Sequence, residues 1–347
     1  GSFEPFTRPE ILEADLTPLA LSLAEWGTEP STLRWLDPPP QAAYAEARAL
    51  LRDLDALDET GRITTEGKAL ARLPVPPRLA HMIVASARRG EAALAATIAV
   101  VIGERGLGGQ DVDLRHRIAA LANDRSPRAR DARQLAESWR RLSGDTATAI
   151  DPERTGAVLA LAYPDRIARA RTGRPGEFLL ANGRGVMLDA ADALAREPFL
   201  AVAEIAGAPP RARIIQAVPL TEAEILDEFA AHIATTDDAQ FDVATRSVRA
   251  RRVRRLGAIV LGEEVIAPDP ETTRSALLAG IRAHGLDLLP WMPGLRQWQA
   301  RVRFLRKTES EEWPDVSDAA LIATIDTWLG PFLLGRRDLD LGPTVLE

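Results

Sequence analysis

Residues 50–79 read LLRDLDALDETGRITTEGKALARLPVPPRL, and this stretch decides how the first part of the chain folds. Its opening leucines continue a helical repeat that starts after a run of prolines, so the pattern predicts one amphipathic helix over residues 41–57. The residues expected on the buried stripe of this helix are Tyr44, Ala47, Leu51, Leu54 and Leu57.

The second half of the stretch predicts a turn, a short strand and two helix starts. Thr60-Gly61 is a turn signal, and residues 62–64 are typical of a short strand. We expect Thr65 to cap a short helix that ends before Pro74. Pro76-Pro77 are well placed to open the next helix, because proline is accepted in the first helical turn.

The run RWLDPPP, residues 34–40, leads into this region. Each proline disfavours helix in the residue before it, so the chain arrives extended, and we expect Pro40 to be the first helical residue. Trp35 and Leu36 are then expected to pack under the domain. Together with one or two short helices in residues 8–27, these elements indicate a winged-helix domain in a degenerate form.

The character of the sequence changes twice after this domain. Residues 77–143 are helical throughout and predict an all-helical module. Five short apolar runs, each bounded by Gly, Pro or Asn, follow within about 60 residues, which is typical of a small OB-like β-barrel. Residues 241–267 predict two or three more strands, and helices return from Pro270. We therefore expect an α+β multidomain fold with the domain boundaries 1–75, 76–150, 151–220 and 221–347.

Length and composition narrow the class of protein. A chain of 347 residues suggests two or three domains. It has no cysteine, which excludes disulfides and cysteine-bound zinc. It also has no apolar run of about 18 residues, so we expect a cytoplasmic protein. The net charge of −7 argues against a protein whose whole surface embraces nucleic acid. The first two residues, Gly1-Ser2, are typical of the scar left by tag removal.

Signatures of catalysis are missing from the sequence. The nearest approach to a Walker A loop is GRITTEGKA, residues 61–69, which has one residue too many between its glycines and Ala69 in place of the magnesium-binding hydroxyl. The glycine-rich GERGLGG, residues 103–109, follows a helix rather than a strand, and we interpret it as a flexible loop. None of the histidines has a second ligand at metal-site spacing, so no metal site is expected.

The most basic run is RSVRARRVRR, residues 246–255, which contains no acid. Read as a strand, it places its arginines on both faces. One interpretation is a solvated, edge-like strand whose arginines discourage aggregation and pair with nearby acids. The other is a strand that contacts phosphates, for which guanidinium is suited because it binds them bidentately. The sequence leaves both interpretations open.

A second basic segment is the helix LRQWQARVRFLRK, residues 295–307. Leu295, Trp298, Val302 and Leu305 are expected to form its buried stripe, with the cations on a solvated face. Few other aromatic residues are available to fill this end of the chain. We therefore expect its tryptophans to lie in a core: Trp291, Trp298, Trp313 and Trp328.

The order winged helix, helical module and small barrel is that of the region which follows the motor in DEAH-box helicases. The sequence resembles the winged-helix segment of that family at Asp37-Pro38-Pro39, Leu51 to Asp58, Ile63 to Gly67 and Leu73 to Leu79. AYPDRIARA, GEFLLANGRGVMLDAADAL and PFLAVAEIAG look like its OB-fold segment. The resemblance is strongest to the bacterial HrpB-type helicases, and RRLGAIVLGEEV with the tryptophan-containing tail is similar to their C-terminal extension.

The resemblance implies a parent protein that is an ATP-dependent RNA or DNA helicase, with ATP and magnesium held by two RecA-like motor domains. The Walker A loop and DEAH box of those domains are absent from this sequence. No catalytic residue is therefore carried over, and no cofactor is expected for this chain. Residues 1–10 comprise the scar and a stretch that looks like the end of the motor. The helical module is then ratchet-like, and the C-terminal extension is mixed β and helical.

The expected partners are single-stranded RNA or DNA and the motor domains of the same protein, with no membrane. The candidate contacts are chosen by charge and position: Arg166 and Arg169 in the first barrel strand, and Arg246, Arg249, Arg251 and Arg252 in the basic run. Two other functions remain open. One is a non-enzymatic adaptor that binds a protein or a nucleic acid. The other is a winged-helix transcription regulator, for which the helix over 41–57 is too acidic to suit a major groove.

Overall fold

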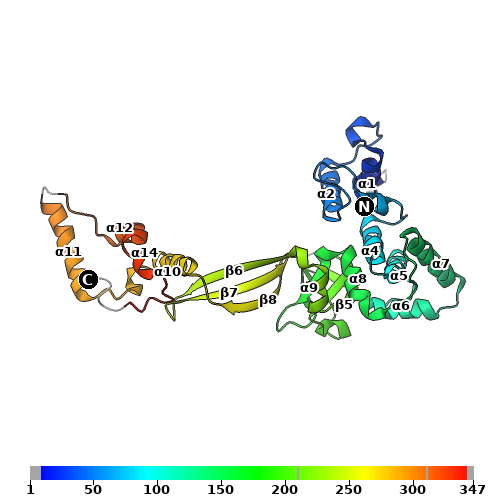
Figure 1. The fold of residues 1–347 in the computed structure, drawn as a ribbon. Helices are drawn as coiled ribbons and strands as arrows, with labels where there is room; N and C mark the ends of the chain where they lie inside the picture. The colour runs from blue at the N-terminus through cyan, green and yellow to red at the C-terminus, as the bar shows by residue number, and fades with distance from the viewer. Residues whose placement is uncertain (1–8, 209–210, 310–311, 342–347) are drawn as a thin grey trace, which may run out of the picture. The chain divides into compact units, whose positions relative to one another are not determined.

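The computed structural model describes residues 9–208, 211–309 and 312–341 (Figure 1). The chain divides into two compact units. The first unit is Gly1–His232 together with Gly257–Ile259, and the second is Ile233–Leu256 together with Val260–Glu347. The expected winged-helix, helical and barrel elements all lie in the first unit. The boundaries expected between those three parts stay predictions.

The first unit opens with short helices. A 3₁₀ turn η1 (Glu10–Leu12) precedes helix α1 (Thr17–Trp26), and a second turn η2 (Pro30–Thr32) precedes helix α2 (Gln41–Asp53). Helix α2 ends four residues earlier than expected, and Pro40 is its N-cap rather than its first residue. The expectation for Leu36 is wrong, because this side chain is 99% exposed. Trp35 is half-buried, and its indole N–H donates to the carbonyl of Pro30 (2.8 Å).

The motif Ile63 to Gly67 is a compact helix start. Thr64, and not Thr65, caps helix α3 (Thr65–Ala71): its hydroxyl accepts from the amide of Gly67 (3.0 Å) and donates to the carbonyl of Asp55 (2.6 Å). A lone bridge between Leu57 and Ile63 is what remains of the predicted strand. The segment that approaches a Walker A loop is therefore a turn followed by a capped helix.

Four helices make the next part, and their order agrees with the predicted all-helical module. They are α4 (Pro77–Ala87), α5 (Ala92–Gly103), α6 (Leu114–Asn123) and α7 (Pro127–Leu142). Helix α5 is apolar on every side because it packs against α4, α6, α7 and α8 and is buried along most of its length. Pro77 and Pro127 each occupy the first position of their helix, where no backbone N–H is needed.

A closed five-stranded barrel follows, as the apolar runs predicted. It is preceded by η3 (Pro152–Arg154), α8 (Thr155–Ala162) and η4 (Pro164–Arg166). The strands, in the barrel order β1-β2-β3-β5-β4, are β1 (Ile167–Ala170), β2 (Glu177–Leu180), β3 (Gly185–Met187), β4 (Phe199–Ala206) and β5 (Arg213–Pro219). The turn η5 (Ala193–Arg196) separates β3 from β4. Alternate strand residues fill the interior, among them Phe178, Leu180, Val186, Leu200, Val202 and Ile214. Helix α9 (Glu222–Glu228) and η6 (Ala230–His232) end the unit.

The second unit is a three-stranded sheet with short helices. The sheet has the order β6 (Ile233–Asp242), β7 (Ser247–Leu256) and β8 (Ile259–Ile266). The helical elements are α10 (Pro270–His284), η7 (Leu286–Leu288), α11 (Pro293–Thr308), α12 (Asp318–Ala323), α13 (Ile325–Trp328) and α14 (Gly330–Leu333). Helix α10 packs on β6, and Gly280 gives Phe241 room, since a methyl group there would lie 2.3 Å from the ring.

The tryptophan prediction for this unit is wrong at one position. Trp291 and Trp328 lie at the edge of the core, with ring centroids 6.3 Å apart and edge-to-face. Trp313 is half-buried. Trp298 is 50% exposed and lies outside the core.

A half-buried histidine of α4 makes the stability of the first unit depend on pH. Burial lowers the pKa of His81; Arg88 acts in the same direction, and Glu66 and Asp55 oppose it. The unfolded chain therefore takes up this proton more readily, so stability is lost as the pH falls below about 6.5. We expect the melting temperature to drop between about pH 7.5 and 5.5 less steeply for His81→Gln than for the wild type. The exposed His284→Gln is the control for calorimetry, and equal slopes for all three proteins would contradict the prediction.

Candidate nucleic-acid interface

The Leu73 to Leu79 motif and the AYPDRIARA motif contact each other just before the first barrel strand. Arg78, from the Leu73 to Leu79 motif, donates to the carboxylate of Asp165 (2.7 Å) and to the carbonyl of Ala162 (3.2 Å). Its guanidinium lies 5.6 Å from the ring centroid of Tyr163. Arg166 lies 4.4 Å from the same ring centroid. This contact joins α4 to the barrel, which gives both motifs a structural reason.

The two candidate arginines near the barrel differ in their position. Arg166 lies in η4, just before β1 rather than in it, and donates to the carbonyl of Ala203 (2.6 Å). Its guanidinium is thus held by a ring and a carbonyl. Arg169 lies in β1, between Leu179 of β2 and Phe199 of β4, and is half-buried.

Three candidates on β7 pair with carboxylates of neighbouring strands or of the turn. Arg249 pairs with Asp242 (3.1 Å), and Arg251 pairs with Glu263 (2.9 Å). Arg252 binds both oxygens of Asp237 (2.8 and 2.9 Å), and these hydrogen bonds lower the pKa of that carboxyl. The fourth candidate, Arg246, is exposed in the β6–β7 turn with a φ of 50°.

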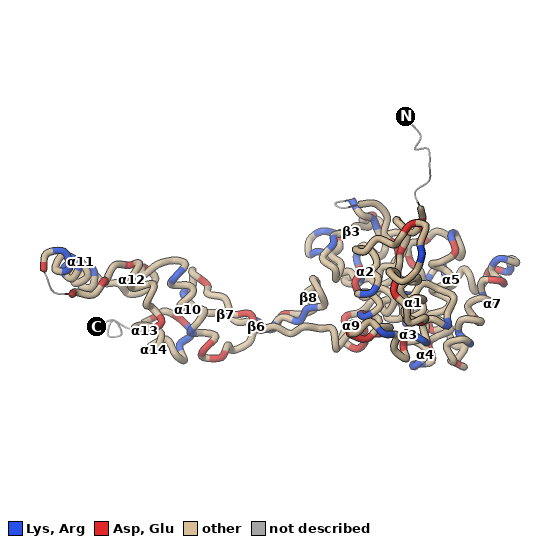
Figure 2. Tube along the Cα trace, turned by 90° about the horizontal axis from the view of Figure 1, so that it is seen from above, with Lys and Arg blue, Asp and Glu red and all other residues tan. Residues whose placement is uncertain are grey.

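The sheet as a whole is balanced in charge, as the alternation of blue and red along it indicates (Figure 2). Strand β7 carries five arginines, and its neighbours β6 and β8 together carry five carboxylates, namely Asp237, Asp238, Asp242, Glu263 and Glu264. Strand β7 is central, so the prediction of an edge-like strand is wrong, although the predicted pairing with nearby acids is present. The missed acids had a signal in the sequence, because TTDDAQFD and GEEV flank the basic run at strand spacing.

The glycine-rich loop after α5 is held rather than flexible. Arg117 of α6 is buried, and its guanidinium donates to the carbonyls of Leu107 (3.0 and 3.2 Å) and Val101 (3.3 Å). Gly108 lies against the backbone of Arg117, where a methyl group would be 2.2 Å from the carbonyl oxygen. Burial lowers the pKa of Arg117. The carbonyl oxygens of Leu107 and Val101 accept hydrogen bonds from this cation. A site lined by carbonyl oxygens is unsuited to a phosphate, which needs hydrogen-bond donors.

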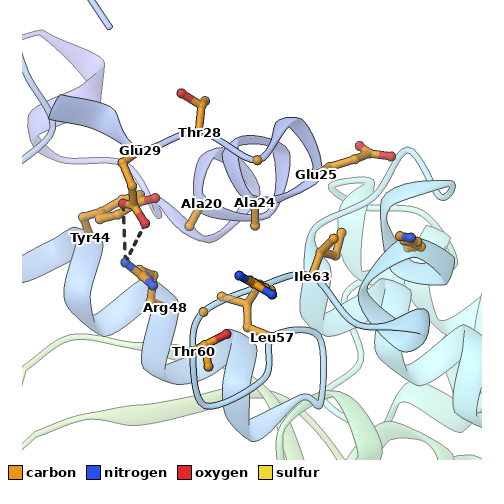
Figure 3. Close-up of a pocket in the computed structure, with 14 residues that line it drawn as sticks. Ala20, Ala24, Glu25, Thr28, Glu29, Tyr44, Arg48, Leu57, Thr60 and Ile63 are labelled. Atoms are coloured by element: carbon orange, nitrogen blue, oxygen red, sulfur yellow. Dashed lines mark hydrogen bonds and ion pairs between the residues drawn. The ribbon is translucent and has the colours of Figure 1, made fainter. Parts of the chain in front are cut away.

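A pocket of about 500 Å³ lies between α1, α2 and the turn after α2 (Figure 3). Arg48 donates to both carboxylate oxygens of Glu29 (3.1 and 3.4 Å). The guanidinium of Arg48 lies over Gly61, where a methyl group would be 1.9 Å from Nη2. Burial raises the pKa of Tyr44 on the same wall. The pocket is thus built around an ion pair rather than a reactive group.

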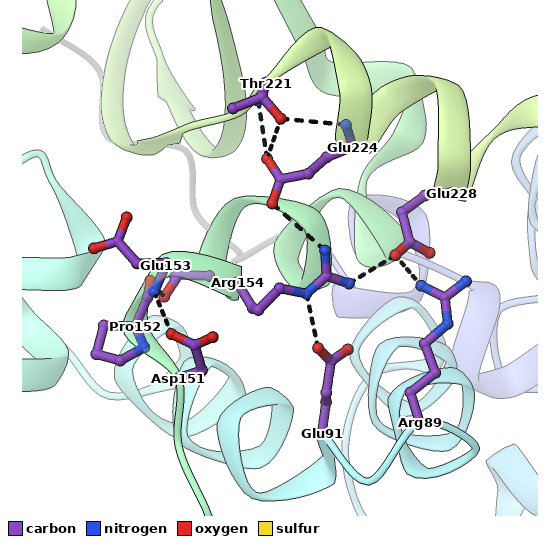
Figure 4. Close-up of polar contacts among 10 residues, drawn as sticks. Arg89, Glu91, Asp151, Pro152, Glu153, Arg154, Thr221, Glu224 and Glu228 are labelled. Carbon is purple, nitrogen blue, oxygen red and sulfur yellow. Dashed lines mark hydrogen bonds and ion pairs between the residues drawn. The ribbon is translucent and has the colours of Figure 1, made fainter.

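An ionic cluster joins the helical part to the segment after the barrel (Figure 4). Arg154 donates to Glu91 (2.8 Å) and to Glu228 (2.8 Å), and lies 3.5 Å from Glu224. Arg89 also contacts Glu228, whose side chain is only 2% exposed. Glu224 further closes a capping box with Thr221 at the start of α9.

Neither a metal-binding cluster nor a membrane-spanning helix occurs in the part of the chain that the structure describes. Within residues 9–208, 211–309 and 312–341 no group of three or more His, Asp or Glu side chains is placed to hold a metal ion. In the same ranges no helix is both long enough and apolar enough to cross a membrane.

The winged-helix segment, the helical bundle and the closed barrel define the class. The family described as the helicase-associated domain (HA2), winged-helix, matches residues 47–75. This match covers α3 and the turn before it, together with most of α2. The chain thus carries an accessory region of the helicase-associated type.

The particular relatives point to one kind of helicase. The chain is 33% identical over 339 residues to the ATP-dependent RNA helicase HrpB of Escherichia coli (strain K12), which covers 96% of this chain and 40% of that protein. Over 84 residues, or 24% of the chain and 7% of the relative, it is 34% identical to the probable ATP-dependent RNA helicase DHX34 of Homo sapiens.

Solved structures agree with the sequence relationship. The crystal structure of the E. coli DExH-box NTPase HrpB has a TM-score of 0.67 and 32% identity, over 96% of this chain and 41% of that one. A second structure, of the E. coli DEAH/RHA helicase HrpB, has a TM-score of 0.65 and 30% identity over the same shares. The chain is the counterpart of the C-terminal region of HrpB-type helicases, and it spans about two fifths of their length.

Proposed function

We propose that this chain is the accessory region of an ATP-dependent RNA helicase and guides single-stranded nucleic acid past the RecA-like motor domains. The observation that carries the proposal is the 33% identity to HrpB across 96% of the chain, with the fold retained at a TM-score of 0.67. The chain itself neither binds nor hydrolyses ATP in this proposal. Its nearest Walker-like segment is a turn and a capped helix, and ATP and magnesium belong to the motor domains.

The proposed contacts are the backbone phosphates, which give sequence-tolerant binding. Arg246 is exposed, and it is available to a phosphate as it stands. Arg249, Arg251 and Arg252 would exchange a surface carboxylate for a phosphate, which costs little because exposed ion pairs contribute only about 0–1 kcal/mol. Arg166 and Arg169 are further proposed contacts in the first unit, where the guanidinium of Arg166 is held by the ring of Tyr163 and the carbonyl of Ala203.

Titration of the chain with short fluorescent oligonucleotides tests this function. We expect single-stranded RNA or DNA to bind more tightly than duplex, and affinity to fall several-fold between about 50 and 200 mM salt. Arg249→Glu with Arg251→Glu should weaken binding about tenfold, because two phosphate contacts become repulsive. ATP should leave every curve unchanged.

The control carries the same change in net charge elsewhere in the second unit. Arg274→Glu with Arg282→Glu alters two paired arginines of α10, the first half-buried and the second exposed, and should leave the affinity within about twofold. If the β7 variant bound as tightly as the wild type, the basic strand would be structural. If no single strand bound to the wild-type chain, the adaptor function for a protein partner would replace this proposal.

A further inference from the structure

The strongest unbalanced charge in the second unit is on α11. This helix carries five cations and no acid in its 16 residues, on a chain whose net charge is −7: Arg296, Arg301, Arg303, Arg306 and Lys307. Figure 2 shows them as a blue cluster on the tube of α11. The contrast with β7 is direct, because the arginines of β7 are matched by as many carboxylates on the neighbouring strands.

Only part of this charge is neutralised by neighbours. Arg296 pairs with Asp287 (2.6 Å) and Asp318 (3.0 Å), and Arg306 pairs with Asp315 (2.6 Å). Within residues 9–208, 211–309 and 312–341, Arg301 and Lys307 have no ion pair. Positive charge is therefore left available on the helix.

Large aromatic side chains share this surface with the cations. Trp298 is 50% exposed and Phe304 is 65% exposed, although burial of either ring would be favourable in water. Arg301 lies between them at a spacing of three residues on each side, so all three side chains share one face of the helix. We call Trp298, Arg301 and Phe304 the α11 face.

The rest of the second unit fixes the direction of this face. Gln299 is buried and donates to the carbonyl of Val316 (2.6 Å) and to Asp318 (2.6 Å). Arg296 holds the same segment through Asp318. These contacts hold the side of α11 that carries Gln299 and Arg296 against the rest of the unit. Trp298 and Phe304 project from other sides of the helix and are therefore left exposed to solvent. This is why the predicted buried stripe fails at Trp298.

We propose that the α11 face binds single-stranded nucleic acid, with bases stacked on Trp298 and Phe304 and a phosphate held by Arg301. The proposal rests on the proposed function for its choice of ligand class. The two rings are six residues apart, or about 9 Å along the helix. Bases in a duplex are stacked about 3.4 Å apart, so only an unstacked strand can place a base on each ring. The face is accordingly a single-strand site that tolerates any sequence.

Oligonucleotide anisotropy with the whole chain tests the site. Trp298→Ala with Phe304→Ala should weaken binding of a single strand of about 12 nucleotides by tenfold or more, with little effect on duplex. The control is Trp26→Ala with Phe332→Ala, which removes the same two residue types from exposed positions on α1 and α14, and should bind like the wild type. Trp298→Phe should retain most of the affinity, whereas Trp298→Leu should lose it, because only an aromatic ring stacks.

The outcomes separate this inference from the proposed function. If the wild-type chain binds single strands and the Trp298→Ala, Phe304→Ala variant binds equally well, the site is wrong and the proposed function stands. If the wild-type chain binds no single strand, both are wrong. If binding of anionic phosphatidylglycerol vesicles, and not of oligonucleotides, depends on Trp298 and Phe304, the surface recognises lipid and the inference is overturned.

Discussion

Gly67→Ala is expected to destabilise the first unit by about 3 kcal/mol, although the change adds only one methyl group. That methyl would lie 2.2 Å from the carbonyl oxygen of Ala56 and 2.7 Å from a side-chain carbon of Ile63. A backbone carbonyl cannot swing aside as a flexible side chain can. Ala56 is further fixed because its carbonyl accepts the amide of Thr64 (3.0 Å). Helix α3 must therefore move as a body.

Calorimetry of the chain measures this effect, and Gly103→Ala is the matched control. Gly103 ends helix α5 with open space around it, so alanine there should be neutral or stabilising by up to about 1 kcal/mol. The melting temperature of Gly67→Ala should fall by about 6–12 °C for the first unit. Equal melting temperatures for Gly67→Ala and the wild type would show that α3 is not docked against Ala56.

The same geometry explains why the opening stretch was informative as sequence. Asp58 builds the turn by accepting from Thr60 (2.7 Å) and from the amide of Arg62 (2.9 Å). Thr64 then caps α3, and Gly67 permits the close approach to Ala56. Each residue type has a local role within ten positions, and local roles are what a single sequence reveals.

The barrel was predictable for a related reason, and part of the second unit was not. The barrel strands are short runs in which alternating burial is clearest in β2 and β3, and each run is bounded by a turn signal that the sequence displays directly. Strand β6 starts at Ile233, eight residues before the predicted strands, and most of its side chains are exposed. Residues 234–238 of β6 are all exposed to solvent, and a stretch that is exposed on both faces of a sheet shows no alternation of apolar and polar residues. Helices return from Pro270 as predicted, but after Asp318 they are short: α12, α13 and α14 are separated at Thr324 and Leu329, the latter just before the Gly330-Pro331 pair.

The candidate site depends even more than the fold on contacts between distant parts of the sequence. The basic run could be found in the sequence. Whether its arginines are available to a phosphate depends on the carboxylates that β6 and β8 place beside them, and the pattern of one strand does not give its register with its neighbours. Likewise the spacing of α11 predicted an apolar stripe through Trp298. Which side of an amphipathic helix is buried depends on its partners, and Gln299 with Asp318 decided it. Contacts between distant segments thus set the function of both surfaces.

Arg154→Met is expected to cost about 3 kcal/mol, because it leaves the half-buried carboxylate of Glu91 without a cation and the buried carboxylate of Glu228 with one cation in place of two. Arg154 is the centre of the ionic cluster, and its removal leaves Glu91 unpaired and Glu228 with Arg89 alone (Figure 4). The matched control is Arg174→Met, which breaks an exposed pair with Glu177 and should change stability by less than about 1 kcal/mol. Calorimetry at neutral pH compares the two directly.

A second substitution distinguishes charge from lost packing. In the Arg154→Met background, Glu228→Gln should raise the melting temperature, because it removes one of three carboxylates that then face the single cation of Arg89. In the wild-type background Glu228→Gln should lower it, since both arginines then lose a partner. If Glu228→Gln lowered stability equally in both backgrounds, the cluster would act through packing and not through charge.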